Sequence, residues 1–182
     1  MQKGPYLNGG FFGTQISGDN LGGYNQPGLN LGIGLVLPFR NDLGLDQSLE
    51  FVQKGSRKNQ NPDRGDYTTY FLRMNYLAYH LSVKKQFSKV GLAIGSQVAY
   101  FINAKEEVNG FEFLTREFKP YDLTLFLNVS YAFHSNWEAI FGIDQGIVPV
   151  RDHPVGTAFK WNKGQYTEAL KTGMRYYFGG KN

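Results

Sequence analysis

Hydrophobic and polar residues alternate with a period of two along several stretches of this chain. In 121–133, the clearest stretch, every second residue is Tyr, Leu, Val or Phe, and most residues between them are Asp, Thr, Asn or Ser. Side chains of a β-strand point alternately to its two faces, so each such stretch predicts a strand with one apolar and one polar face. The pattern predicts eight strands, at 6–16, 28–39, 43–54, 68–86, 90–103, 121–133, 137–148 and 165–178.

The connections between these strands alternate in length. Long polar loops follow the first, third, fifth and seventh strands, and short turns follow the second, fourth and sixth. Barrels of the bacterial outer membrane have this layout, with short periplasmic turns and longer outer loops, and tilted strands of ~9–11 residues suffice to cross the lipid. We therefore predict an all-β protein, an eight-stranded antiparallel up-and-down transmembrane β-barrel, with residues 1–182 as a single outer-membrane domain. An even strand number places both termini on one side, which we expect to be the periplasm.

Aromatic residues collect at the ends of the predicted strands. Aromatic side chains favour the two membrane–water interfaces of a bilayer, and a soluble sandwich has no reason to sort them into two belts. We predict one girdle near the short turns, made of Phe39, Phe87, Phe133, Trp137 and Phe178. A second girdle is predicted near the long loops, made of Tyr67, Tyr70, Tyr100, Tyr121 and Tyr166.

The alternation changes phase within 68–86. Leu72, Met74 and Tyr76 are the apolar residues in its first part, whereas 77, 79, 81 and 83 are apolar in its second part. An extra residue in one strand shifts the phase in this way, so we predict a β-bulge near Tyr76. We expect the adjacent Lys84 and Lys85 at the lipid interface.

Composition narrows the class of protein. The 182 residues carry a formal net charge of +4 and no Cys, which excludes disulfides and Cys-bound metals. No apolar run reaches the ~18 residues of a transmembrane helix. The first residues lack the apolar core of a signal peptide, so we expect an exported form to have lost its leader. The basic residues are spread over turns and loops, which favours a solvated or lipopolysaccharide-facing surface over a nucleic-acid-binding stripe.

If the apolar faces point to lipid, the charged residues of the strands point into the lumen. A barrel of about eight strands is just wide enough for side chains to fill, and an unpaired buried charge is very costly. We therefore predict a packed network of ion pairs, with a narrow conducting or binding lumen as the rival interpretation. The predicted members are Asp46, Glu50, Lys54, Arg73, Asp122, Glu138, Asp144, Lys171 and Arg175.

Signals for catalysis and metal binding are weak. The three histidines, His80, His134 and His153, lack metal-ligand spacing, and no Gly-x-Ser-x-Gly elbow is present. His80 with Ser82 is the single local hint of a hydrolase site. The loop 59–66 contains oxygen ligands but lacks the closing Glu of an EF-hand, so we expect it to be solvated. We predict no metal, no cofactor and no enzymatic activity.

One loop stands out as a surface for a protein partner. The segment 106–118 mixes apolar side chains with charges, and apolar residues on an outer loop tend to mark a contact surface. The candidate residues are Phe111, Phe113, Leu114 and Phe118.

Several segments together resemble a known family. They are 27–32 (Pro-Gly-Leu-Asn-Leu-Gly), 49–55 (Leu-Glu-Phe-Val-Gln-Lys-Gly), 70–77, 91–95 and the ending 173–178 (Gly-Met-Arg-Tyr-Tyr-Phe). The chain resembles the PorT-like outer-membrane β-barrel family of Bacteroidota, which is related in architecture to OmpA and OmpX barrels. Asn75 stands where that family often has Pro. The resemblance implies an eight-stranded barrel, and it implies work in type 9 secretion or gliding machinery or beside larger membrane assemblies.

These observations predict an accessory or scaffold subunit of a larger outer-membrane complex, with a filled lumen and with outer loops or a lipid-facing wall that contact the partner. Expected partners are outer-membrane lipid, lipopolysaccharide and other outer-membrane proteins. One alternative is an outer-leaflet lipid-modifying enzyme, with a polar cluster near His80 or His153 on the outside wall. The other is a soluble lipocalin-like barrel, with Leu29, Leu31, Ile33 and Leu125 facing inward.

Overall fold

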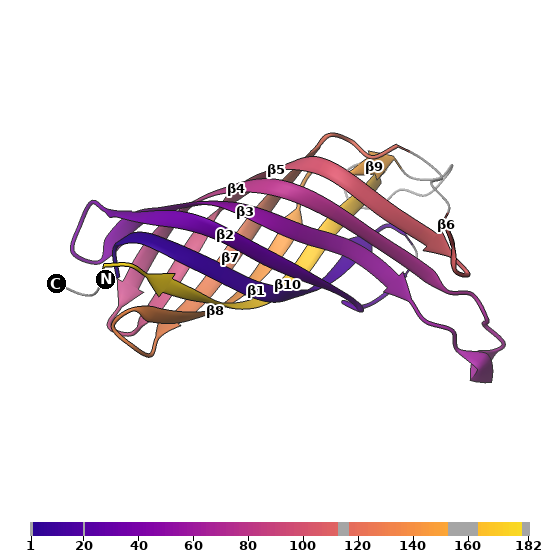
Figure 1. The fold of residues 1–182 in the computed structure, drawn as a ribbon, viewed down its shortest axis with the longest axis horizontal. Helices are drawn as coiled ribbons and strands as arrows, with labels where there is room; N and C mark the ends of the chain where they lie inside the picture. Colours follow the sequence, from indigo (N-terminus) through magenta and orange to yellow (C-terminus); the bar gives the residue numbers. More distant parts are fainter. Residues whose placement is uncertain (1, 20, 113–116, 153–163, 180–182) are drawn as a thin grey trace.

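Eight long antiparallel strands close into a barrel in the computed structural model, which describes residues 2–19, 21–112, 117–152 and 164–179 (Figure 1). The long strands are β1 (Gly4–Ser17), β2 (Gln26–Pro38), β3 (Leu43–Lys58), β4 (Tyr70–Phe87), β5 (Val90–Val108), β7 (Tyr121–Ala132), β8 (Trp137–Gly146) and β10 (Gly164–Tyr177). Each pairs with its neighbour in sequence, and β1 pairs with β10 to close the sheet. The predicted fold class is confirmed.

The described residues also form three short elements. A single turn of 3-10 helix, η1 (Pro62–Arg64), lies between β3 and β4. The two-residue strands β6 (Phe111–Glu112) and β9 (Arg151–Asp152) pair with β5 and β10. The end of the barrel that carries both chain termini and the short turns is called the turn end, and the opposite end is called the loop end (Figure 1).

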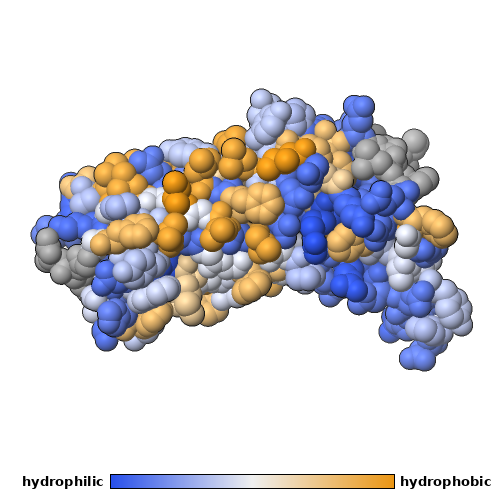
Figure 2. Space-filling model, viewed as in Figure 1, coloured by the Kyte–Doolittle hydropathy of each residue, from blue (hydrophilic) through white to orange (hydrophobic). Residues whose placement is uncertain are grey.

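The outer wall is apolar from the turn end to about the middle of the long axis, and hydrophilic side chains gather at the loop end (Figure 2). In β4 the outer face from Leu77 to Phe87 is apolar except at Lys85, and 11 residues at ~3.3 Å and a tilt of ~40° span about 28 Å, close to the lipid-facing band of known barrels. This apolar part of the outer wall is called the belt. Its exposed residues include Leu7, Phe11, Leu29, Leu31, Ile33, Leu49, Leu77, Tyr79, Leu81, Leu92, Ile94, Val98, Leu125, Leu127, Val129, Phe141, Ile143, Leu170 and Met174.

This belt contradicts the soluble-barrel alternative. Leu29, Leu31, Ile33 and Leu125, which that alternative places inside, are 40% to 64% exposed on the outside. Burying a large apolar side chain is worth about 1.5–3 kcal/mol, so water is an unfavourable surrounding for so many of them. Among the described residues, no helix is long and apolar enough to cross a membrane.

The polarity of the wall reverses toward the loop end. There the interior is apolar, with Leu72, Met74 and Tyr76 of β4 packed in one buried cluster with Phe12, Ile16 and Val52. The outer face at this level carries an amide ladder across three strands: Gln53 Nε2 donates to Asn75 Oδ1 at 3.0 Å, and Asn75 Nδ2 donates to Asn103 Oδ1 at 2.6 Å. A barrel that leaves the lipid needs this reversal, because its outer face now meets water.

The change of phase in β4 therefore has a different cause from the predicted one. Alternation in β4 is unbroken, with Leu72 to Gln86 facing inward at every second position. The register does shift at Asn75 and Tyr76, but the extra residue lies in β5, because Asn75 pairs with Asn103 and Tyr76 with Phe101. The predicted bulge is at the right level and in the wrong strand.

A hairpin that the strand prediction omitted extends β5. Asn109 and Gly110 both have positive φ, 53° and 81°, and they connect β5 to β6. Asn-Gly is the favoured pair for a two-residue turn with positive φ at both positions. Residues 104–108, predicted as loop, therefore continue β5 to Val108.

The belt leads to a prediction for stability. Ile94→Arg places a charge on the lipid-facing wall, so we expect it to lower the free energy of unfolding by about 2–4 kcal/mol, the usual cost near the bilayer midplane. Reversible urea unfolding of the barrel in phospholipid vesicles measures it. Phe111→Arg at the exposed loop end is the control and should change stability by less than ~0.5 kcal/mol. Equal effects of the two substitutions would contradict a membrane-embedded belt.

Candidate functional site

Paired charges line the inner face of the barrel. The pairs are Lys54 with Asp122 (2.8 Å), Lys84 with Glu138 (2.5 Å), Lys171 with Asp144 (2.9 Å), His80 with Glu50 (3.1 Å) and Arg175 with Asp46. Each of these side chains is at most 9% exposed. The pairs contain eight of the nine residues predicted for the lumen, and they add Lys84 and His80.

A compact cluster fills the lumen near the turn end. The Glu138 carboxylate accepts three hydrogen bonds there. Lys84 Nζ donates to its two oxygens at 2.5 and 2.7 Å, and the Tyr177 hydroxyl donates at 3.0 Å. The Tyr6 hydroxyl donates to Asp46 at 2.5 Å, and the Arg175 guanidinium lies over the Tyr6 ring, 4.3 Å from its centroid. Every charge in the cluster has an opposite charge or a phenol beside it, which offsets the cost of its burial.

The fit of this cluster depends on a glycine. A Cβ added at Gly34 would lie 2.2 Å from the Tyr6 ring, well inside contact distance. Tyr6 can therefore cross the lumen above β2 and reach Asp46 because position 34 has no side chain. Below the cluster, the Gln2 side-chain amide donates to the carbonyls of His134 and Ser135, both at 3.0 Å, so the turn end is closed.

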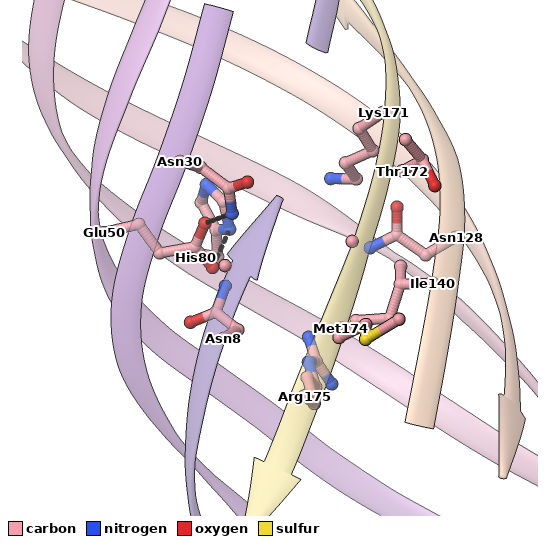
Figure 3. A pocket seen from close by; sticks show the side chains of 12 residues that line it. Asn8, Asn30, Glu50, His80, Asn128, Ile140, Lys171, Thr172, Met174 and Arg175 are labelled. Carbon is pink, nitrogen blue, oxygen red and sulfur yellow. Dashed lines mark hydrogen bonds and ion pairs between the residues drawn. The ribbon is translucent and has the colours of Figure 1, made fainter. Parts of the chain in front are cut away.

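A small polar cavity lies midway along the lumen (Figure 3). On one side Glu50 accepts hydrogen bonds from Asn30 at 2.8 Å and Ser48 at 2.7 Å and contacts His80, and on the other side lie Lys171 and Asn128 (Figure 3). Its volume is about 30 Å³, and a water molecule needs roughly 10–15 Å³ measured this way. The cavity has room for one or two water molecules, but an organic substrate does not fit.

Two groups of side chains close the loop-side part of the lumen. The first is a buried polar cluster around Lys54, called the Lys54 knot, and the second is a cap at the mouth of the barrel. Lys54 Nζ donates to Asp122 at 2.8 Å and to Thr124 at 3.0 Å, and Thr167 donates to the same carboxylate at 2.8 Å. Beyond it lie the apolar cluster and then the mouth of the barrel.

At the mouth, the side chains of Arg151, Glu106 and Tyr70, which lie outside the lipid-facing belt, bind one another and form the cap. Arg151 donates to Glu106 and to the Tyr70 hydroxyl, each at 3.1 Å, and Tyr70 donates to Glu106 at 2.6 Å. Burial and the hydrogen bond to Glu106 raise the pKa of Tyr70 well above its usual range. Burial opposes the charged form of Arg151, but its hydrogen bonds to Glu106 and Tyr70 raise its pKa above the ordinary value. The cap therefore keeps a fixed guanidinium–carboxylate pair at the mouth.

Several predicted site residues lie elsewhere. The lumen prediction is wrong for Arg73, which is on the outer face of β4 with its guanidinium 5.2 Å from the centre of the Phe71 ring; the unbroken alternation of β4 turns it outward. The girdle prediction is wrong for Tyr70, which lies in the cap, and for Tyr166, which is 3% exposed. The other girdle residues are exposed: Phe39, Phe87, Phe133, Trp137, Phe178, Tyr67, Tyr100 and Tyr121.

The candidate residues of the predicted partner loop do not share one surface. Phe111 is 78% exposed at the tip of the β5–β6 hairpin. Phe118 instead stacks on Phe101, with ring centroids 5.5 Å apart, and lies beneath the Arg151 guanidinium. Phe118 therefore belongs to the cap. Phe113 and Leu114 lie outside the described residues.

The proposed exterior hydrolase site is wrong in its geometry. His80 and Ser82 face the lumen and are 7% and 5% exposed. Ser48 is the cross-strand neighbour of His80, but its hydroxyl donates to Glu50, and Glu50 in turn contacts His80. The carboxylate therefore links the serine and the histidine, whereas a triad needs the histidine in the middle. His134 is in a turn, and His153 lies outside the described residues. Within those residues, no three His, Asp or Glu side chains are grouped to hold a metal ion.

Lys84 and His80 are the lumen residues that the sequence prediction missed. Leu77, Tyr79, Leu81 and Val83 form an unbroken apolar face, so the residues between them must face the lumen. That alternation was sufficient to place His80 and Lys84 inside. Lys84 does not lie at the lipid interface, whereas Lys85 is exposed.

The comparisons with known proteins concern the fold. No protein-family model matches the chain, and no curated protein matches it. Among solved structures, Neisserial surface protein A (NspA) superposes with a TM-score of 0.62 at 14% identity, covering 96% of this chain and 97% of that one. Ail, the attachment invasion locus protein of Yersinia pestis, gives 0.57 at 14% identity, covering 97% and 99%.

The Yersinia pestis outer membrane protein Ail in a phospholipid bilayer nanodisc gives a TM-score of 0.51 at 14% identity, covering 96% of this chain and all of that one. This chain has the fold of the small outer-membrane barrels. A structural match at 14% identity shows that the fold is shared and nothing further. These comparisons therefore do not identify the PorT-like family.

The buried pairs lead to a stability prediction. We expect Lys54→Met to lower the free energy of unfolding by about 3–5 kcal/mol, because it leaves the Asp122 charge buried and unpaired. The double variant Lys54→Met/Asp122→Leu should recover most of that loss. Urea unfolding in phospholipid vesicles compares them, with Lys119→Met as control, since the Lys119–Asp152 pair is solvent-exposed and is worth at most ~1 kcal/mol. A double variant as unstable as the single one would show that pairing is not the cause.

The filled lumen leads to a second prediction. The reconstituted barrel should give no discrete current steps in a planar bilayer, because the turn-end cluster, the Lys54 knot and the cap each occupy the cross-section. A general porin in the same membrane provides the positive control. Reproducible single-channel steps from the pure protein would contradict a closed lumen.

Proposed function

We propose that this protein is an integral outer-membrane barrel that acts by binding, as an accessory or scaffold subunit of a larger outer-membrane complex. The observation that carries the proposal is the occupied lumen: paired side chains fill it at three levels, and its one central cavity among the described residues holds little more than water. A barrel without an internal route or substrate pocket has its outer surfaces available for function.

The proposed orientation places the turn end in the periplasm and the loop end outside the cell. Short turns are periplasmic in barrels of this type, and longer loops are extracellular. In this orientation the loop-side half of the belt faces the outer leaflet, where lipopolysaccharide is the neighbouring lipid.

The loop-end sheet is the surface that best fits a protein partner. β5 pairs with β7 only as far as Tyr100, opposite Tyr121, and then continues to Val108. On one side, residues 101–108 of β5 pair with β4. On the other side, the described residues supply two paired positions with β6 and one hydrogen bond from the Phe101 N–H to the Pro120 carbonyl. An open strand edge can accept a strand from another protein, and the exposed Phe111 ring lies beside it.

The kind of complex follows from the resemblance to PorT-like barrels. The segments that show this resemblance include 49–55, 70–77 and the Gly-Met-Arg-Tyr-Tyr-Phe ending at 173–178. That resemblance supports a place in a secretion or gliding assembly of the type 9 class in Bacteroidota, as a finer form of the same proposal.

Site-specific photo-cross-linking in native cells tests the partner surface. A photoreactive residue at Phe111 or at Lys105, both exposed on the loop-end sheet, should cross-link to a discrete protein, because a docked partner covers that sheet. The control position is Ile94, 66% exposed on the lipid-facing wall, where we expect lipid adducts alone. Protein cross-links at none of the three positions would contradict the scaffold role. Cross-links at Ile94 alone would contradict the loop-end surface.

A further inference from the structure

The two ends of the barrel differ in charge. The turn end carries four surface cations, Lys3, Arg40, Lys85 and Lys89, against one carboxylate, Asp42. Asp42 lies 3.8 Å from Lys85, and within the described residues the other three cations have no ion-pair partner. At the loop end, the described residues carry nine carboxylates and seven cations. Among the described residues, the excess of positive charge is therefore at the turn end.

An apolar groove opens in the lipid-facing wall beside this end. It has a volume of about 430 Å³ and lies across β1 to β4, between Pro5, Ile33, Leu35, Leu49, Tyr79 and Phe178. On its wall, the Gln47 side chain accepts a hydrogen bond from the Tyr79 hydroxyl at 2.8 Å. With that acceptor occupied, the groove is suited to a hydrocarbon chain rather than to a polar ligand.

The groove and the free cations adjoin. Pro5 pairs with Leu35 and Gly4 pairs with Val36, and Lys3 directly precedes them at the end of β1. Arg40 lies in the turn that joins β2 to β3, five residues beyond Leu35, and its N–H binds the Leu43 carbonyl at 3.2 Å. Both cations are exposed. An amphiphile whose chain lies in the groove therefore has its head group at Lys3 and Arg40.

We propose that this region is a binding site for an anionic glycerophospholipid of the periplasmic leaflet. The groove takes one acyl chain, and Lys3 and Arg40 bind the head-group phosphate. A lipid surface is the one environment that presents hydrocarbon and phosphate at adjacent depths. The inference rests on the proposed insertion and orientation of the barrel and is independent of its having a protein partner.

The proposed orientation selects phospholipid over lipopolysaccharide as the occupant. Lipopolysaccharide faces the loop end in that orientation, whereas the groove and its two cations lie at the turn end. A cation near an anionic membrane surface contributes about 1 kcal/mol, which corresponds to about fivefold in affinity. Two cations at one head group therefore give about 25-fold preference for an anionic over a zwitterionic lipid of the same chains.

Native mass spectrometry of the barrel in mild detergent tests the site, with phosphatidylglycerol and phosphatidylcholine of identical acyl chains as probes. We expect one phosphatidylglycerol to be retained about 25-fold more strongly than phosphatidylcholine. Lys3→Gln/Arg40→Gln should abolish that preference, and Leu35→Trp, which fills the groove, should weaken binding of both lipids. Leu35→Phe is the milder filling variant, and heat-modified mobility on gels verifies that each variant is folded.

Matched controls separate a site from diffuse attraction. Lys119→Gln removes an exposed cation at the loop end, and Ile143→Trp enlarges an exposed belt residue on β8, away from the groove. Neither should change retention by more than about twofold. Equal retention of the two lipids by the natural sequence, or equal losses in the variants and their controls, would overturn the proposal. Such a failure leaves the cross-linking result untouched, so the two proposals fail separately.

Discussion

The pairing of charge inside a wall that faces lipid is the constraint on which this barrel depends. An eight-stranded barrel is too narrow for bulk water, so charged residues on its inner faces cannot be solvated. Five carboxylates and their basic partners on different strands therefore contact one another inside the lumen. Each pair joins residues that are at least 27 positions apart in sequence. Three of them, for example Lys54 and Asp122, join strands that are not neighbours in the sheet, so these pairs also fix which strands face each other.

The same constraint explains where the polarity of the wall reverses. Strands β3, β4 and β5 are 16, 18 and 19 residues long, more than the lipid requires. Beyond the belt their outer faces meet water, so amides and Arg73 turn outward while Leu72 and Met74 form an ordinary apolar core. One strand, β4, thus follows the membrane pattern over one half and the pattern of a soluble sheet over the other.

The two ends follow from this division and suggest different partners. Among the described residues, the loop end offers an open strand edge and an exposed aromatic ring above a capped mouth, which suits a protein. The turn end offers cations beside an apolar groove, which suits a lipid. Because the lumen is occupied, both proposed interactions would take place on the outside of the barrel, and the barrel itself would serve as the rigid support that holds them at a fixed separation.

The sequence by itself determined the number of strands, their approximate bounds, the alternation of loops and turns, and the inward face of six strands. These features depend on local alternation, which the chain carries directly. The tertiary structure decided what alternation cannot express: that β4 keeps its phase while the surroundings change from lipid to water, that Arg73 is therefore outside and Lys84 inside, and that Tyr70, Phe118 and Arg151 meet as a cap. Those placements depend on how far each strand extends past the lipid and on which distant residues face each other when the sheet closes, and neither is a property of any single stretch of sequence.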